Sequence, residues 1–284
     1  MSNWLDWPNS VQFGLRTYFK ELMLGLWLAM NCVVISFYDQ RDTADLAELL
    51  RGMQRYDAGA PYRIQIVINQ TRTELPQLDF LPTGIPVEVM SRENVGYNIG
   101  AWEAGWRTCE ADAYLFLQQE CRIRMSGWLQ AFLNRLQEPG VGLVGESLMT
   151  YWDEPWEEIP DSMRFIKLPE HNINGEPVAD RVECYLHQLK HWGIDPGPKA
   201  THLQSLVLCT TRPILEQIDG FPIGRNYGEA IAAEIGISRK VEACGYRLRQ
   251  VGSKPFTWID HPQWTSQQKM SWLRKLWHKL SGRA

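Results

Sequence analysis

The chain has 284 residues, 44% of them hydrophobic and 22% charged, which is an ordinary globular composition and enough length for one large α/β domain with an appendage. A net charge of −4 and a pI near 5.9 argue against a general nucleic-acid binder. The six cysteines are widely dispersed, which fits reduced thiols in a cytosolic protein better than a zinc site or a disulfide framework.

The first 31 residues are predicted to form an N-terminal helical extension. Apolar residues recur at helical spacing between Val11 and Leu26, after the start signal Pro8-Asn9-Ser10. Leu22–Tyr38 carries no charge over 17 residues, which is the lower edge for a membrane span. Its second half is β-branched, so we interpret the stretch as a helix that runs into a first buried strand. Met1–Asn9 lacks the basic region of a secretory signal, and we expect none.

Residues 32–262 are predicted to form one α/β domain, because short apolar runs alternate with amphipathic ones. The predicted strands are Val33–Phe37, Ile64–Ile68, Val87–Val89, 113–117, Val141–Val144, Leu203–Leu208 and Tyr246–Val251. The predicted helices are Thr43–Tyr56, Ala101–Arg107, Gly127–Leu136, Arg212–Ile218 and Glu229–Cys244. This alternation predicts a mostly parallel central sheet with helices on both faces. Residues 150–200 show little periodicity and are predicted to form a long excursion over the active face.

Polar residues and glycines follow two of the predicted strands, Val87–Val89 and 113–117. The apolar run Tyr114–Leu117 stops at Gln118-Gln119-Glu120, and Asn94–Gly100 holds two glycines and two asparagines. Such residues allow tight turns and a close approach of the backbone to a ligand. Because open α/β sheets bind ligands outside the carboxyl ends of their strands, we expect a binding crevice here.

In their order and motifs these elements resemble the inverting glycosyltransferases of the family-two type, whose fold is the Rossmann-like GT-A fold. The matching residues, in chain order, are Tyr38-Asp39, Asn69, Asn94-Val95-Gly96, Asp219-Gly220-Phe221 and Ala233-Glu234. The loop from Gly96 to Trp102 is similar to the variant found in rhamnan and related surface-polysaccharide synthesis proteins. The chain departs from the family most clearly at two motifs: Gln118-Gln119-Glu120 occupies the place of the Asp-x-Asp metal motif, and Ile68 occupies the place of an aspartate.

The resemblance implies that the protein moves a hexose or deoxyhexose from a nucleotide-diphosphate sugar to a glycan hydroxyl with inversion. The residues expected to bind the donor are Tyr38, Asp39, Asn69, Asn94, Gly96, Gln118 and Gln119. The residues expected to contact the sugar or the acceptor are His202, Gly220 and Phe221. Glu120 and His261 are expected to hold Mg²⁺ or Mn²⁺, and Glu234 to act as the catalytic base.

The chemistry of these carboxylates leaves alternatives open. Inverting transfer needs one carboxylate that takes the proton from the acceptor hydroxyl. The sequence around Glu234 is otherwise apolar, which favours a partly buried carboxylate with a raised pKa, but a solvated glutamate or a base at Glu229 are alternatives. A divalent ion usually needs one or two carboxylates beside the phosphates, and Gln118 removes one. Basic side chains could neutralise the leaving diphosphate instead.

The C-terminal residues 263–284 are predicted to form a basic amphipathic helix. Met270, Leu273, Trp277 and Leu280 fall on one helical face, and the segment carries five lysines and arginines and no acid. This pattern is typical of a helix that lies in a membrane surface, although a helix packed on the core is the alternative. We expect a cytoplasmic protein held peripherally at the inner membrane through 265–284, where the acceptor would be a lipid-linked glycan.

A different class of function is the main alternative. The loss of the first metal-motif aspartate at Gln118 favours a catalytically inactive GT-A-like module that binds nucleotide sugars or glycans. A Rossmann-like oxidoreductase is disfavoured, because Tyr38-Asp39-Gln40-Arg41 follows the first strand where Gly-x-Gly-x-x-Gly would be required.

Overall fold

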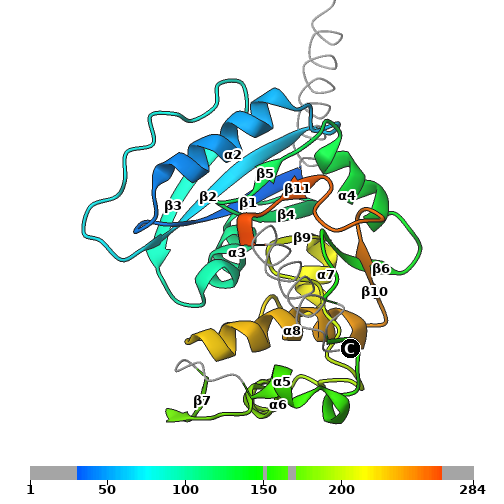
Figure 1. The fold of residues 1–284 in the computed structure, drawn as a ribbon. Helices are drawn as coiled ribbons and strands as arrows, with labels where there is room; N and C mark the ends of the chain where they lie inside the picture. Colours follow the sequence, from blue (N-terminus) through cyan, green and yellow to red (C-terminus); the bar gives the residue numbers. More distant parts are fainter. Residues whose placement is uncertain (1–30, 150–151, 166–170, 264–284) are drawn as a thin grey trace, which may run out of the picture.

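The computed structural model of the chain describes residues 31–149, 152–165 and 171–263, built on a seven-stranded sheet in the order β10-β6-β9-β4-β1-β2-β3 (Figure 1). The strands are β1 (Asn31–Tyr38), β2 (Tyr62–Gln70), β3 (Val87–Glu93), β4 (Ala113–Gln118), β6 (Val141–Gly145), β9 (Val207–Thr211) and β10 (Arg247–Gln250). All neighbouring strands are parallel except that β9 runs antiparallel to both β4 and β6. The predicted α/β class with a mostly parallel sheet is therefore confirmed, and it is consistent with a Rossmann-like GT-A arrangement.

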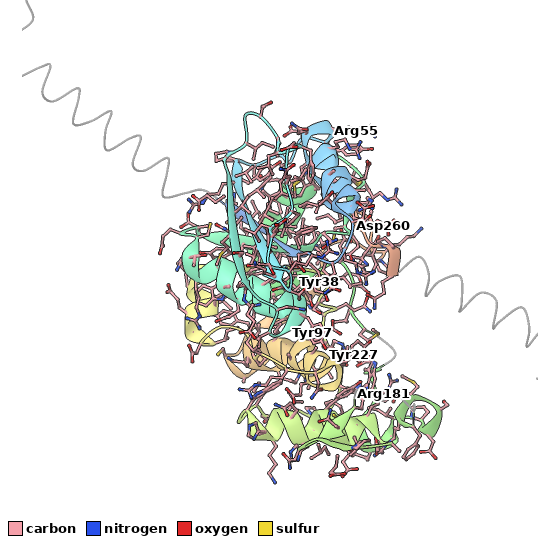
Figure 2. All side chains as sticks on the ribbon, turned by 90° about the vertical axis from the view of Figure 1, so that its left-hand side faces the viewer. Tyr38, Arg55, Tyr97, Arg181, Tyr227 and Asp260 are labelled. Atoms are coloured by element: carbon pink, nitrogen blue, oxygen red, sulfur yellow. The ribbon has the colours of Figure 1, made fainter. Side chains whose placement is uncertain are left out.

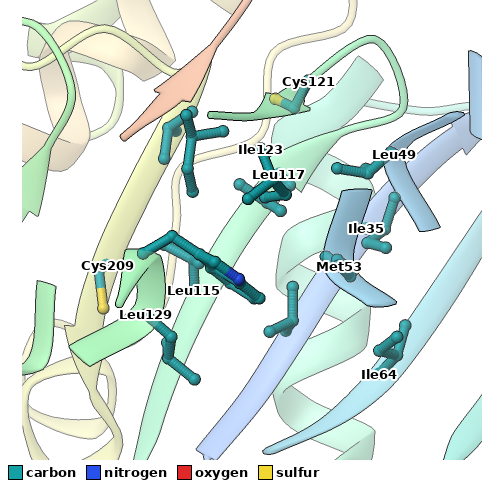
Figure 3. Close-up of a cluster of buried hydrophobic side chains, with 14 of the residues drawn as sticks. Ile35, Leu49, Met53, Ile64, Leu115, Leu117, Cys121, Ile123, Leu129 and Cys209 are labelled. Carbon is teal, nitrogen blue, oxygen red and sulfur yellow. The ribbon is translucent and has the colours of Figure 1, made fainter. Parts of the chain in front are cut away.

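Helices cover both faces of the sheet. One face carries α2 (Thr43–Arg55) and α4 (Trp128–Leu136), and the other carries α3 (Tyr97–Thr108), α7 (Arg212–Gln217) and α8 (Tyr227–Ala243) (Figure 1). β1 shows how alternation builds the two cores, because Val33 and Ile35 point to the α2 face while Cys32 and Val34 point to the α3 face. Figure 3 shows the first of these cores, where side chains of α2 pack on strand residues such as Ile35.

The region predicted to lack periodicity forms a further layer beyond α8. Its elements are η2 (Trp156–Glu158), α5 (Asp161–Arg164), β7 (Asn172–Ile173), β8 (Glu176–Pro177) and α6 (Arg181–His191). α6 packs against α8 through a third buried cluster that includes Tyr185 and Leu189 (Figure 1). Asp180 begins this helix by accepting hydrogen bonds from the first amides of α6, so a regular helix replaces part of the irregular excursion that we predicted.

The short strands β5 (Arg122–Ile123) and β11 (Ile259–Asp260) pair as a two-stranded ribbon that the sequence did not predict. The predicted N-terminal helix and the basic C-terminal helix lie outside the described residues, apart from Asn31 and Gln263. Within the described ranges, no helix has the length and hydropathy that crossing a bilayer requires. All six cysteines are free thiols, as predicted.

Candidate functional site

A pocket of about 250 Å³ lies at the carboxyl ends of β1, β2 and β4. Its lining residues are Ser36, Tyr38, Arg41, Asn69, Asn94, Tyr97, Asn98, Gln118, Gln119 and Glu120. Parallel strands end at the same edge of the sheet, and the register sets Ser36 beside Gln118 and Tyr38 beside Asn69. We call this the strand-end pocket, and it is the crevice that the sequence predicts.

A second pocket of about 470 Å³ adjoins the first, and we call it the Glu234 pocket. The two pockets share four lining residues, which are Arg41, Tyr97, Asn98 and Gln118. The other walls come from α6, α8, Trp152 and the loop at 202–206, and they include Arg181, Tyr227 and Glu234. In Figure 2, Tyr38, Tyr97, Tyr227 and Arg181 follow one another from the sheet down to the layer of α6. The pockets form one continuous cleft, to which Asn94, Glu120 and Glu234 all contribute.

The backbone of Ser205 joins the two pockets. Its carbonyl accepts hydrogen bonds from the side-chain amides of Asn98, at 2.7 Å, and Gln118, at 2.8 Å. Its N–H donates to Glu234 Oε2 at 2.5 Å. The backbone of this one residue therefore connects α3, the end of β4 and α8, and it fixes the position of Glu234 relative to the strand-end pocket.

Glu234 and His202 form a buried pair in which both groups are held firmly. Glu234 is 9% exposed and His202 1% exposed. The His202 Nδ1 lies 2.7 Å from the carbonyl oxygen of Ala200, which only accepts hydrogen bonds, so Nδ1 carries a hydrogen. The His202 Nε2 lies 3.0 Å from Glu234 Oε1. Two acceptors cannot face each other at this distance, so a proton lies between His202 and Glu234.

The pKa of Glu234 differs from our prediction. Burial alone raises the pKa of this carboxyl, but the hydrogen bond and charge of His202 and the bonds from Ser205 outweigh burial and hold the pKa below the usual 4.5. The prediction of a raised pKa was wrong because it counted the apolar helix around Glu234 and not the partners from the loop at 200–205.

Glu229, the rival candidate for the base, has a different place. Its carboxylate accepts hydrogen bonds from the Arg225 N–H at 2.6 Å and from the Asn226 side chain at 2.8 Å, and Asn226 caps the first turn of α8 in return. This reciprocal pattern resembles a capping box, except that the Glu229 side chain bonds the Arg225 N–H and not the N–H of the cap residue. Glu229 is not among the residues that line the cleft.

The loop Asn94–Gly100, which we call the Asn/Gly loop, is a turn held in place by hydrogen bonds from Asn69 and Arg92. Arg92 donates to Asn69 Oδ1 at 2.9 Å and to the Val95 carbonyl at 2.8 Å, while Asn69 Nδ2 donates to the Tyr97 carbonyl at 2.9 Å. Gly96 has φ +82° at the start of α3, and a Cβ there would lie 2.6 Å from Cγ2 of Ile223. Gly96 is thus needed for the turn and for packing, and it does not line either pocket.

Three further residues predicted to bind ligands have internal partners instead. The Asp39 carboxylate accepts from the Thr71 hydroxyl and N–H, both at 2.7 Å, and from the Arg72 N–H at 2.8 Å. Burial acts to raise the pKa of Asp39, but these hydrogen bonds lower it overall. Gly220 and Phe221 belong to a turn whose Phe221 N–H donates to Glu103, and the Phe221 ring packs in the core. Asp39, Gly220 and Phe221, which were expected to contact the donor or acceptor, do not line the cleft.

The donor set in the strand-end pocket does not fit the predicted Mg²⁺ or Mn²⁺ site. Glu120 is the one carboxylate among the residues that line this pocket, and burial raises its pKa. The Gln119 Oε1 is already taken by the Tyr38 N–H at 2.7 Å, and Gln118 bonds Ser205 through its nitrogen. The described ranges contain no group of three or more His, Cys, Asp or Glu side chains that could hold a metal ion. A cation does line the pocket: the exposed guanidinium of Arg41.

His261, the second predicted metal ligand, lies just after β11 and is 4% exposed. Its Nδ1 accepts from the Gln263 N–H at 3.2 Å, and its buried Nε2 has no hydrogen-bond partner among the residues described. Burial lowers the pKa of His261 to about 4, so the ring is neutral at pH 7. His261 does not line the cleft, and the structure therefore does not unite it with Glu120 in a metal site.

Sequence reasoning missed several residues of the cleft, namely Arg41, Tyr97, Asn98, Arg181 and Tyr227. Tyr97 and Asn98 stand inside the Asn/Gly motif, and Arg41 lies three residues after the end of β1, so position along the strands could have found them. Arg181 and Tyr227 each begin a helix, and only the packing of α6 on α8 brings them together.

A scan against models of protein families found no match, and neither did a search of curated proteins. Among the solved structures that match is the mannosyltransferase PcManGT from Pyrobaculum calidifontis in complex with GDP-Man and Mn²⁺. It has 13% sequence identity to this chain and a TM-score of 0.47. The match covers 78% of this chain and 54% of PcManGT, so the chain spans about half the length of that protein.

Proposed function

We propose that the protein is an inverting glycosyltransferase that binds a nucleotide-diphosphate sugar in the strand-end pocket and its acceptor in the Glu234 pocket. The continuous cleft supports this assignment most directly, because the backbone of Ser205 holds a single carboxylate, Glu234, across from the polar ends of β1, β2 and β4. The nucleotide would contact Tyr38 and Asn94, with Asn69 acting through the turn that it supports.

In the reaction, the acceptor hydroxyl attacks the anomeric carbon as the bond to the nucleotide diphosphate breaks on the opposite face. Glu234 takes the hydroxyl proton. Each of its oxygens already accepts one hydrogen bond, and a carboxylate oxygen has room for a second, so the acceptor can be bound while His202 and Ser205 stay in place. His202 is a positioning residue that orients this carboxylate and keeps it ionised.

The negative charge of the leaving diphosphate is met by Arg41, which lines both pockets. Guanidinium groups bind phosphates through paired hydrogen bonds and keep their charge at all physiological pH values. Transfer is therefore expected to persist in EDTA. Loss of activity in EDTA, restored by Mn²⁺ or Mg²⁺, would reinstate a metal site at Glu120.

The decisive comparison is Glu234→Gln with Glu229→Gln, which makes the same change one and a half turns away on the same helix. Purified protein is screened with nucleotide sugars by thermal shift, since a bound donor stabilises the fold. Donor hydrolysis or transfer is then measured. Loss of a general base should reduce the rate by about 10² to 10⁴ in Glu234→Gln, with donor binding retained, whereas Glu229→Gln stays near the wild-type rate. Donor binding without turnover in the wild type would favour the inactive binding module instead.

The acceptor is proposed to be a glycan, lipid-linked at the inner membrane face, in bacterial surface polysaccharide synthesis. This part depends on residues 265–284, which lie outside the described ranges. Deletion of 265–284 is expected to release the protein from anionic liposomes, and unchanged binding would refute that role for the tail.

A further inference from the structure

Arg181 and Trp152 form one wall of the Glu234 pocket. The guanidinium carbon of Arg181 lies 4.6 Å from the centre of the Trp152 ring, and its Nε donates to the Met163 carbonyl. Trp152 is 6% exposed, so the cation rests on a buried aromatic surface. Contact of this kind fixes the plane of a guanidinium without using its N–H groups, of which Nε is taken by Met163 and another interacts with the Tyr185 hydroxyl.

The charge of Arg181 is not used by a neighbouring acid. Asp180, which precedes it, is paired with Arg164 and caps α6. Glu234 lines the same pocket, but one of its oxygens accepts from His202 and the other from Ser205. Within the part of the chain that the structure describes, Arg181 therefore has no carboxylate partner.

The facing wall is one side of α8. Tyr227, Ile231 and Glu234 all line the pocket, and their spacing of four and three residues sets them along one helical face. Tyr227 and Glu234 are separated by roughly 10 Å along the helix axis, at 1.5 Å per residue. The pocket thus extends from the proposed base past a half-exposed aromatic ring, further than the reacting sugar ring alone requires.

We propose that this wall binds the acceptor, and that Arg181 selects an acceptor that carries a carboxylate or phosphate group. The inference rests on the proposed function, because it takes Glu234 as the base. A guanidinium matches both anions with two parallel hydrogen bonds, and partial burial strengthens the interaction relative to a surface site. The Tyr227 ring supplies an apolar surface for the face of a sugar.

Binding of three probes to the full chain tests this assignment: glucuronic acid, glucose 1-phosphate and methyl glucoside, titrated by calorimetry with the strand-end pocket saturated by UDP or GDP. The charged probes should bind more tightly than methyl glucoside, and comparison of the two charged probes distinguishes a carboxylate from a phosphate acceptor. Arg181→Met should weaken the charged probes by about tenfold to a hundredfold, the value of a charged hydrogen bond, and leave nucleotide affinity unchanged.

Arg181→Lys should recover only part of the affinity, because an ammonium cannot make the paired bonds. Arg51→Met serves as a control, since Arg51 is paired with Glu48 on the exposed side of α2. Tyr227→Ala should weaken the binding of all three probes, and it tests the same wall of the pocket if Arg181→Met does not fold. Equal binding of neutral and charged probes, or a loss of nucleotide affinity in Arg181→Met, would overturn the inference. A failure of the wild type to bind any nucleoside diphosphate would count against the proposed function instead.

Discussion

Replacing His202 by leucine removes the hydrogen bond and the charge that hold Glu234 ionised, and leaves burial as the dominant influence on that carboxyl. The pKa of Glu234 should then rise above 4.5 instead of lying below it. Breaking a buried ion pair by removing one partner costs about 3 to 5 kcal/mol, because the remaining charge is left buried without compensation. The free energy of unfolding at pH 7 should fall by an amount in this range.

The sign of the pH dependence follows from the direction of each shift. In the wild type the folded-state pKa of Glu234 is lowered, so its contribution to stability is present above about 4.5 and is lost as the pH falls through the folded value. In His202→Leu the folded-state pKa is raised, so this carboxyl destabilises the fold increasingly as the pH rises through that value. The difference in stability between wild type and variant should therefore be larger at pH 7 than at pH 4.

Urea unfolding at a series of pH values from 4 to 7 measures this difference, and the pH dependence of kcat/KM measures it in the active enzyme. The acidic limb of kcat/KM should move to higher pH in His202→Leu. His202→Gln is the matched control, because its amide can still donate to Glu234 and should restore much of the wild-type profile. The reasoning is refuted if the leucine variant loses the same stability at every pH and keeps the wild-type acidic limb.

Three further predictions concern the scaffold of the cleft. Gly96→Ala should lower the free energy of unfolding by about 2 to 4 kcal/mol in urea, because φ is +82° and the new Cβ would clash with Ile223. Gly84→Ala is the control, because φ is +84° there but nothing lies within 4 Å of the new Cβ, and it should cost only about 1 to 2 kcal/mol. Equal losses in the two variants would contradict the packing argument. Burial raises the pKa of Glu146 to about 7, so this carboxyl should contribute a fall of about 3 kcal/mol in the free energy of unfolding between pH 4.5 and pH 7. The pH dependence of Glu146→Gln in urea unfolding should lack this contribution, and an unchanged pH dependence would refute it. Asp39→Asn should lower the free energy of unfolding by about 1 to 3 kcal/mol at pH 7, because the Asp39 carboxylate accepts hydrogen bonds from residues 71 and 72. The loss should become smaller in acid, because the pKa of Asp39 is lowered and its contribution to stability disappears as the carboxyl is protonated. Chemical unfolding of wild type and variant at pH 7 and at pH 3 measures this change.

The sequence predicts the centre of the sheet well because the central strands are almost fully buried. Runs such as Val33–Phe37 and Val141–Val144 carry no charge and are almost entirely apolar, and the structure confirms a strand at each. α6 escaped prediction although Asp180 is a good cap and Val182, Tyr185 and Leu189 recur at helical spacing. The Pro- and Trp-rich residues before it hid a regular helix of 11 residues. In this case the signal was present and the composition of its surroundings was given too much weight.

The site was harder to predict because a polar residue at a strand end has the same sequence signature whether it faces a ligand or another part of the chain. Asp39 follows β1 as a nucleotide contact would, yet its oxygens are occupied by the backbone and hydroxyl of residues 71 and 72. The contact of His202 with Glu234 spans 32 residues and depends on the path of the loop before β9, which no local pattern specifies. Asn94, Glu120 and Glu234, which the family resemblance singled out, line adjoining parts of one cleft.

Gln118 stands where the resembling family has the first aspartate of its metal motif, and it has a structural role of its own. A carboxylate at this position could not donate to the Ser205 carbonyl and would repel it, whereas the Gln118 amide donates to it at 2.8 Å. Asn98 adds a second amide donor to the same oxygen, and the N–H on the other side of Ser205 is directed at Glu234. The change that removes a metal ligand therefore supplies an anchor for the loop that positions the carboxylate. With Arg41 as the cation of the same pocket, charge neutralisation and base placement can both be met by this chain's own side chains.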